Sequence, residues 1–134
     1  MRTAKRPARK RLERELRITL NSLRGIGDPR DSHGLTEVAG GRLPDRLETA
    51  RTNEMQEVGF ALRERLMERA RLLRAALERA AGGTYGACLQ CGQSIHAARL
   101  RAIPEVECCI DCQQVIDRLE ISQFAGSTTE QQPR

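Results

Sequence analysis

The chain has 134 residues, a length that fits one domain. Aromatic residues make up only 2% and charged residues 31%, so the large buried aromatic surface of an ordinary compact core is excluded. Ala, Leu, Arg and Glu dominate, which is typical of long or coiled helices. No apolar run approaches the roughly 18 residues of a membrane span, and no apolar segment follows the basic N-terminus as it does in a secretory signal. We therefore expect a cytoplasmic protein whose thiols stay reduced.

The formal net charge is +5, and its distribution is uneven. Residues 1–11 carry six basic side chains and no acid, while the rest of the chain carries 17 basic and 18 acidic residues. We interpret residues 1–7 as a disordered basic arm, and the basicity as a property of this arm and not of a face of the fold. Such an arm is most often simply solvated, but it can contact nucleic acid or another polyanion, and we expect contact with nucleic acid only indirectly or weakly.

Two helices are predicted in the first 81 residues, separated by an irregular loop. In residues 8–24 the 4-3-4 spacing of Leu12, Leu16, Thr19 and Leu23 indicates one side of a helix pair. Residues 25–44 contain five glycines and two prolines, which exclude a long helix. Residues 45–81 contain no proline and keep a 3-4 apolar rhythm that is interrupted at Arg69.

Because neither helix is stable alone, residues 8–81 are predicted to form an antiparallel coiled-coil hairpin. The first helix is shorter than the second. Part of the loop 25–44 therefore runs back along the arm, or the end of the arm is a single helix.

The cysteines carry the strongest signal. Their pattern is Cys88-x₂-Cys91-x₁₇-Cys109-x₂-Cys112, and two C-x-x-C turns at this separation are typical of a Cys₄ zinc site. The few apolar residues between them cannot fold the segment unaided, whereas a structural zinc contributes about 10–16 kcal/mol. We predict one structural Zn²⁺ in residues 82–124, which include a short C-terminal helix over 110–124, and a disordered tail over 125–134. The alternative is a pair of redox dithiols, which usually accompanies a βαβ pattern that is missing here.

Two nearby residues are less favoured as zinc ligands. Cys108 breaks the C-x-x-C spacing and is expected to be a non-ligand, with ligand exchange or redox sensing as the alternative. His96 is not needed once four cysteines are present. Four thiolates leave no open coordination position, and no nucleophile–base pair is evident, so we expect no enzyme activity.

A longer constellation resembles the zinc finger of the DksA/TraR family, bacterial proteins that bind RNA polymerase and reach into its secondary channel with a coiled-coil arm. The residues that carry the resemblance are Gly83, Thr84, Tyr85, Gly86, Cys88, Cys91, Gly92, Ile95, Arg99, Leu100, Ala102, Pro104, Cys109, Cys112 and Gln113. The resemblance implies a mainly α fold: an antiparallel helical hairpin attached to a small Cys₄ zinc finger with a short C-terminal helix. It also implies a monomeric transcription regulator whose partner is bacterial RNA polymerase.

The family has a D-x-x-D-x-A motif at the tip of its coiled coil. The matching segment here runs from Asp45 through Glu48 to Ala50, with Glu48 where the family usually has the second Asp. Asp45 and Glu48 lie three residues apart on one helix face. The alternative explanation is that they are ordinary acids of the first helical turn, where a negative charge interacts favourably with the helix dipole. A second Asp-rich segment at Asp28–Asp31 is rejected because glycines and a proline follow it.

Some family members bind the alarmone ppGpp with basic side chains at the junction of helix and finger. The matching positions here are Leu72, Ile103 and Gln113, none of which is charged, so we expect no ppGpp action through this surface. Two other functional classes remain open: a zinc-ribbon nucleic-acid-binding module that uses the basic arm, and a zinc-stapled adaptor that docks without acting. The finger is poor in basic and aromatic residues, which argues against the first.

Overall fold

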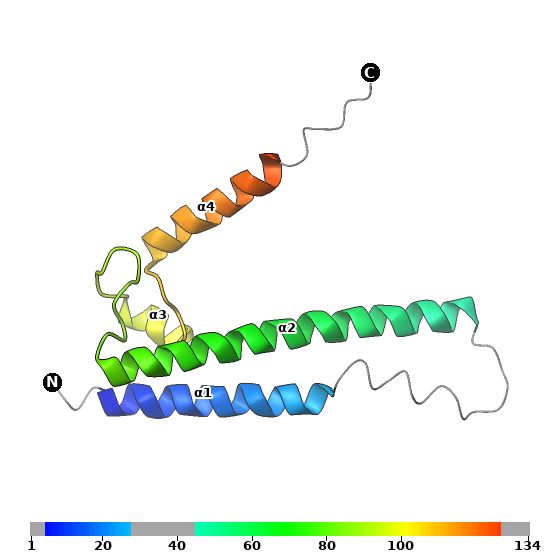
Figure 1. Ribbon diagram of the computed structural model, residues 1–134, viewed down its shortest axis with the longest axis horizontal. Helices are drawn as coiled ribbons and strands as arrows, with labels where there is room; N and C mark the ends of the chain where they lie inside the picture. Colours follow the sequence, from blue (N-terminus) through cyan, green and yellow to red (C-terminus); the bar gives the residue numbers. More distant parts are fainter. Residues whose placement is uncertain (1–4, 28–44, 127–134) are drawn as a thin grey trace, which may run out of the picture.

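The computed structural model describes residues 5–27 and 45–126, and Figure 1 shows the arrangement of their helices. The helices are α1 (Lys5–Ile26), α2 (Arg46–Gly82), α3 (Ala97–Ala102) and α4 (Ile110–Gly126). Within these two ranges the only β pairing is an isolated antiparallel bridge between Ala87 and Ser94. The mainly α architecture, with a helical hairpin, a small finger and a C-terminal helix, is confirmed.

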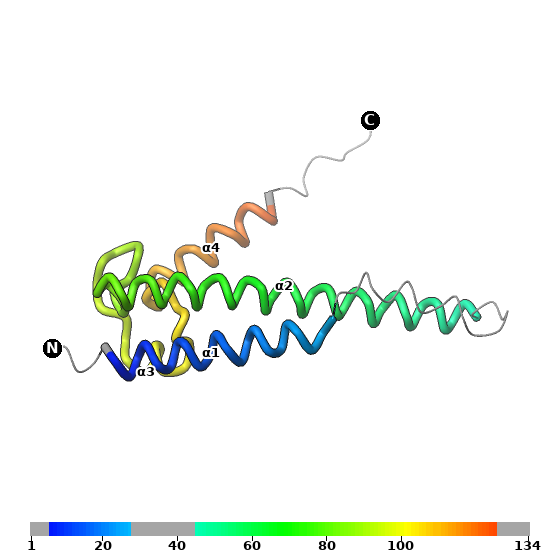
Figure 2. Tube along the Cα trace, turned by 60° about the horizontal axis from the view of Figure 1, so that its bottom comes forward, coloured from blue at the N-terminus to red at the C-terminus, as the bar shows by residue number. Residues whose placement is uncertain are grey.

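The hairpin is held by a narrow seam of Leu and Ala. Helices α1 and α2 lie side by side and antiparallel in both views (Figures 1 and 2). Leu12, Leu73 and Ala76 are completely buried between them. Thr19 is also buried, and its hydroxyl donates a hydrogen bond of 2.9 Å to the Glu15 carbonyl. The polar side chain in the predicted apolar rhythm therefore leaves no unsatisfied group in the seam.

Helix α1 begins at Lys5, three residues before the expected start at residue 8. Pro7 is compatible with this start, because the first turn of a helix needs no backbone N–H donor at that position. At its other end α1 continues through Gly25 to Ile26, so the described part of the expected loop 25–44 is largely helical. Residues 28–44 lie outside the described residues.

The long helix has the expected bounds to within one residue. Asp45 occupies the position before α2 in an extended conformation, and its side chain makes no capping hydrogen bond. Gly83 ends the helix with a φ of 84°, and its N–H donates to the Arg79 carbonyl. A side chain is strained at that φ, which explains why a glycine follows the last turn.

The part of α2 that carries the predicted tip extends past α1. The Arg63 guanidinium donates a 2.9 Å hydrogen bond to the carbonyl of Gly27, just after the end of α1. Residues 46–62 therefore project by about 25 Å at 1.5 Å per residue. Their apolar side chains are exposed, with Leu47 at 68% and Met55 at 76%. Whether the loop returns along this segment depends on residues outside the described ranges.

The break in the apolar rhythm at Arg69 has a structural cause. The Arg69 side chain pairs with Glu15 of α1 through Nη2 at 3.0 Å, and with Glu105 of the finger through Nε at 2.9 Å. Glu105 is 9% exposed, and no other hydrogen-bond partner is described for its second carboxylate oxygen. A single guanidinium thus ties together both helices of the hairpin and the finger.

Other polar contacts fix the same junction. The Arg79 guanidinium pairs with Glu107 at 3.1 Å, and the Tyr85 hydroxyl donates a 2.8 Å hydrogen bond to the Pro104 carbonyl. Burial raises the pKa of the Tyr85 hydroxyl, which further favours the protonated form that donates this bond. The finger is therefore attached to α2 by a short run of residues, 104–107, that follows α3.

Helix α4 points away from the hairpin in both views (Figures 1 and 2). Its base packs on the finger through Cys112 and Ile116. Further out, Leu119 and Phe124 are exposed, at 59% and 85%. The helix continues to Gly126, two residues past the expected end at 124. In the part of the chain that the structure describes, no helix has the length and apolarity that crossing a membrane requires.

Replacing Arg69 with Leu is expected to destabilise the junction. Glu105 would keep its buried carboxylate without a cation, at a cost of about 1–3 kcal/mol. Urea unfolding of the zinc-loaded protein measures this loss. Adding Glu105→Leu to Arg69→Leu should restore most of it, because an apolar pair replaces the ion pair. The control is Arg71→Leu, which removes an exposed pair with Glu68 and should change little. Equal effects of Arg69→Leu and Arg71→Leu would contradict the role of Arg69.

Candidate metal centre

The first cysteine pair lies in a tight turn. The N–H of Cys88 donates to the Gln93 carbonyl at 2.8 Å, and the N–H of Gly92 donates back to the Cys88 carbonyl at 2.9 Å. Gly92 has a φ of 73°, which only glycine adopts without strain. This backbone reversal directly after Cys91 brings the sulfurs of Cys88 and Cys91 to the same side of the turn.

The second pair lies at the start of α4. Cys109 immediately precedes the helix and Cys112 is in its first turn. The N–H of Cys109 donates to the Cys88 sulfur at 3.3 Å, and the N–H of Leu89 donates to the Glu107 carbonyl at 3.0 Å. These contacts join two loops that are about twenty residues apart in the chain.

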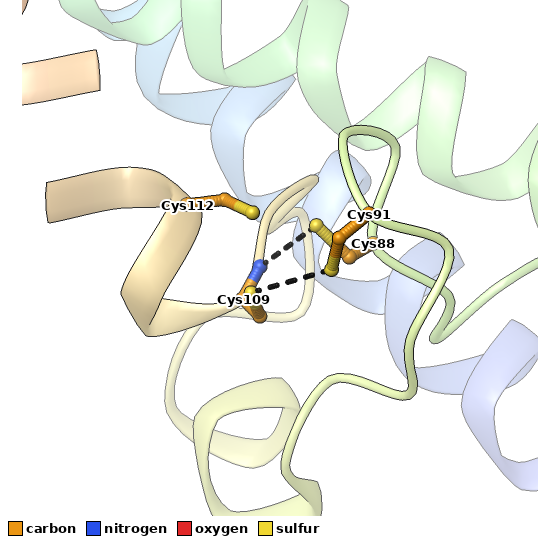
Figure 3. Close-up of side chains that lie close together, drawn as sticks. All are labelled: Cys88, Cys91, Cys109 and Cys112. Carbon is orange, nitrogen blue, oxygen red and sulfur yellow. Dashed lines mark hydrogen bonds between the residues drawn. The ribbon is translucent and has the colours of Figure 1, made fainter. Parts of the chain in front are cut away.

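All four sulfur atoms face a common point (Figure 3), and they lie within 4.8 Å of one another. The Cys91 and Cys109 sulfurs are 3.8 Å apart. A tetrahedron with Zn–S distances of about 2.3 Å has edges of about 3.8 Å, so the sulfurs fit one zinc ion. The thiolate donor set selects zinc over hard cations, and four sulfurs leave no position for water or substrate. The chain therefore carries one structural zinc.

Local hydrogen bonds favour the thiolate form of one ligand, Cys88, in the absence of metal. Backbone N–H groups of Cys91 and Cys109 donate to the Cys88 sulfur and lower its pKa to about 6. Hydrogen bonding with the Cys109 thiol, followed by desolvation, raises the pKa of Cys112. Cys88 is thus a thiolate at neutral pH, while Cys112 releases its proton when the ion binds.

Cys108 and His96, the two residues that were less favoured as zinc ligands, are not part of the cluster of four sulfur atoms. Cys108 is 7% exposed and packs in the small apolar core of the finger with Cys88 and Ile95. Burial, and then the Cys88 charge, raise the pKa of the Cys108 thiol, which disfavours a reactive thiolate. The His96 ring accepts a 3.3 Å hydrogen bond from the N–H of Ala98 and caps α3. Helix α3 itself was not expected from the sequence, because it has only six residues.

The predicted tip residues are not part of this centre. Asp45, Glu48 and Ala50 are exposed at the start of α2, and the finger follows the other end of that helix (Figure 1). The sequence analysis missed the residues that join finger and arm, Arg69 with Glu105 and Arg79 with Glu107. The one available signal was Arg69 itself, a cation at a position where the helix rhythm calls for an apolar residue.

Replacing Cys109 with Ser is expected to reduce the zinc content from one ion per chain to none at nanomolar free zinc. Hydroxyl oxygen is a poor zinc ligand, and the finger has only a small apolar core without the metal. Zinc can be measured by mass spectrometry of the native protein and by release to a chromogenic chelator. Cys108→Ser serves as the matched control, since it changes the adjacent thiol and should keep one zinc. Loss of zinc in both variants would make Cys108 a ligand.

Comparisons with known proteins agree with this geometry. Residues 83–118 match the model of the prokaryotic dksA/traR C4-type zinc finger. Most of the chain is similar to the solved structure of the transcription factor DksA2 from Pseudomonas aeruginosa, with 26% sequence identity and a TM-score of 0.67. The match covers 87% of this chain and 84% of that one. No curated protein sequence matches the chain. Together with the Cys₄ cluster, the match shows that residues 83–118 form a zinc finger of the dksA/traR C4 type, on a fold similar to that of the transcription factor DksA2.

Proposed function

We propose that this protein is a DksA-type transcription factor that binds bacterial RNA polymerase through its secondary channel. The finger docks on the rim, with Cys88, Cys91, Cys109 and Cys112 as its zinc ligands. The tip of α2, at Asp45, Glu48 and Ala50, reaches toward the active site. The match of residues 83–118 to the dksA/traR zinc finger and the similarity of the fold to a transcription factor support this assignment.

The observation that carries the proposal is the reach of α2. The helix has 37 residues, and at 1.5 Å per residue it is about 55 Å long. The finger lies at one end, and two exposed acids lie at the other. A narrow arm of this length is suited to entering a channel while a compact base stays outside.

The tip acts by charge and position in this proposal, without chemistry of its own. Asp45 and Glu48 are exposed, and neither side chain has a described partner in the ranges 5–27 and 45–126. Two free carboxylates can bind basic groups or displace bound metal ions in a partner's site. The protein would then bias the polymerase between states by binding one state more tightly.

Site-specific crosslinking tests the proposed geometry. A photo-reactive residue replaces Leu47, which is 68% exposed beside the tip, and purified bacterial RNA polymerase is added. We expect a crosslink to the large catalytic subunit near its active centre. A matched probe at Ala81, exposed at the finger end of the same helix, should crosslink only outside the channel.

The two probes separate the alternatives. If Leu47 does not crosslink while zinc is bound and Ala81 does, the protein docks as an adaptor without channel entry. If neither probe crosslinks, polymerase is not the partner of this surface.

Neutralising the tip is expected to abolish the effect on transcription without loss of binding. The variant Asp45→Asn with Glu48→Gln should reduce the effect on open-complex lifetime by about tenfold, which corresponds to ~1.4 kcal/mol. Glu54→Gln with Glu57→Gln, which removes two exposed acids further along α2, is the control. Equal effects in both pairs would show that only the net charge of the arm matters. Glu48→Asp then tests whether the extra methylene limits activity.

The three positions that match the family's ppGpp surface are occupied by uncharged side chains. Leu72 is half-buried, Ile103 is 42% exposed, and the Gln113 amide donates to Asp117 at 2.9 Å. The absence of ppGpp action through this surface stays a prediction.

A further inference from the structure

The outward face of α1 carries a row of basic side chains that the proposed function does not use. Arg6, Lys10, Arg14 and Arg17 follow one another at intervals of four, four and three residues, so they lie on one helix face. All four are exposed. We call them the basic stripe. It runs about 16 Å along the helix, on the side opposite the buried Leu12.

The charges of the stripe are not neutralised within the described residues. None of its four members is in an ion pair there, although other arginines of the chain are paired with acids. Glu13, the acid between Lys10 and Arg14, pairs with Arg9 at 2.8 Å. The stripe therefore presents four cations on a helix, and none of them is neutralised by an acid of the described part of the chain.

The structure corrects the sequence-based interpretation of this charge. The basic residues were expected on an arm and not on a face of the fold, but α1 begins at Lys5 and orders most of them. Arg11 points to another side of the helix, where its guanidinium donates to the Arg101 carbonyl of α3. Within α1, Arg11 therefore makes a contact with α3, while the basic stripe forms an exposed face.

The composition of the face favours a phosphate backbone as its partner. The centre of a protein interface usually holds aromatic, Met or other apolar anchors, and the stripe contains none. Phosphates need only positive charge at regular spacing. Along one strand of B-DNA, phosphates rise by about 3.4 Å, so 16 Å of helix faces about five of them.

We propose that the basic stripe of α1 binds the phosphate backbone of a nucleic-acid duplex. The stripe lies on the half of the arm next to the finger and not on the overhanging tip of α2. Each of its four cationic side chains can neutralise a phosphate, and phosphate contacts carry no sequence information, so binding is independent of sequence. The zinc finger does not contribute, and its Arg99 is already bonded to the Cys108 carbonyl at 3.3 Å.

The test is the salt dependence of binding by the full-length, zinc-loaded protein to a fluorescent 20-base-pair DNA duplex. Four phosphate contacts predict a fall in affinity of about 100-fold between 50 and 200 mM salt. The stripe variant replaces Arg6, Lys10, Arg14 and Arg17 with Gln, which keeps helix propensity. It should lose most of this salt slope, by about one for each contact removed.

A charge-matched control separates the stripe from overall basicity. This variant replaces four exposed arginines elsewhere with Gln: Arg51, Arg65, Arg74 and Arg118. It has the same net charge as the stripe variant and should keep the salt slope of the original protein. Helicity and zinc content are checked for both variants.

Two results overturn the proposal. Equal losses of slope in the two variants would show that only net charge drives binding. Tighter binding to poly-glutamate than to duplex DNA, at equal charge concentration, would assign the stripe to an acidic protein surface. Neither result bears on the crosslinking from Leu47, so this inference and the proposed function fail separately.

Discussion

Zinc coordination by four thiolates is the constraint on which the arrangement of finger and arm depends. The buried part of the finger core contains Cys88, Ile95 and Cys108, too little apolar surface to fix two loops and a helix. A closed tetrathiolate site supplies the missing stability, because folding and metal binding are one event in such small domains. Once the loops are joined, residues 104–107 have a fixed course between α3 and α4. Glu105 and Glu107 then lie where Arg69 and Arg79 of α2 can reach them.

The arm is built differently along its length. Near the finger, α1 and α2 share a dry seam centred on Leu12, Leu73 and Ala76, where small side chains let the helices approach closely. Residues 46–62 of α2, which precede Arg63, have no helical partner among the described residues. A 17-residue helix is marginal in water by itself, but extending an existing helix needs no new nucleation. The packed half therefore supports the half of α2 on which Glu48 is exposed.

Arginine has three distinct uses in this chain. Arg69 and Arg79 join elements through paired carboxylates, a role suited to a planar guanidinium with several donors. Arg11 and Arg99 donate to backbone carbonyls and hold α3 and the second cysteine loop. Arg6, Arg14 and Arg17 lie on the outer face of α1 and have no ion-pair partner in the ranges 5–27 and 45–126. The number and position of the charges in the sequence do not distinguish these uses, because each of these arginines lies in a similar polar sequence.

The sequence by itself determined the features that depend on local spacing. The two C-x-x-C turns predicted the metal site, the long proline-free segment predicted α2, and the Leu12–Leu16–Thr19 rhythm predicted α1. Tertiary structure alone decided the rest, because those contacts join residues far apart in the chain. Glu105 meets Arg69 across 36 positions, and α3 is too short to be read from periodicity. The same holds for the basic residues near the N-terminus: whether they form an arm or a face depends on where α1 begins and which side packs on α2.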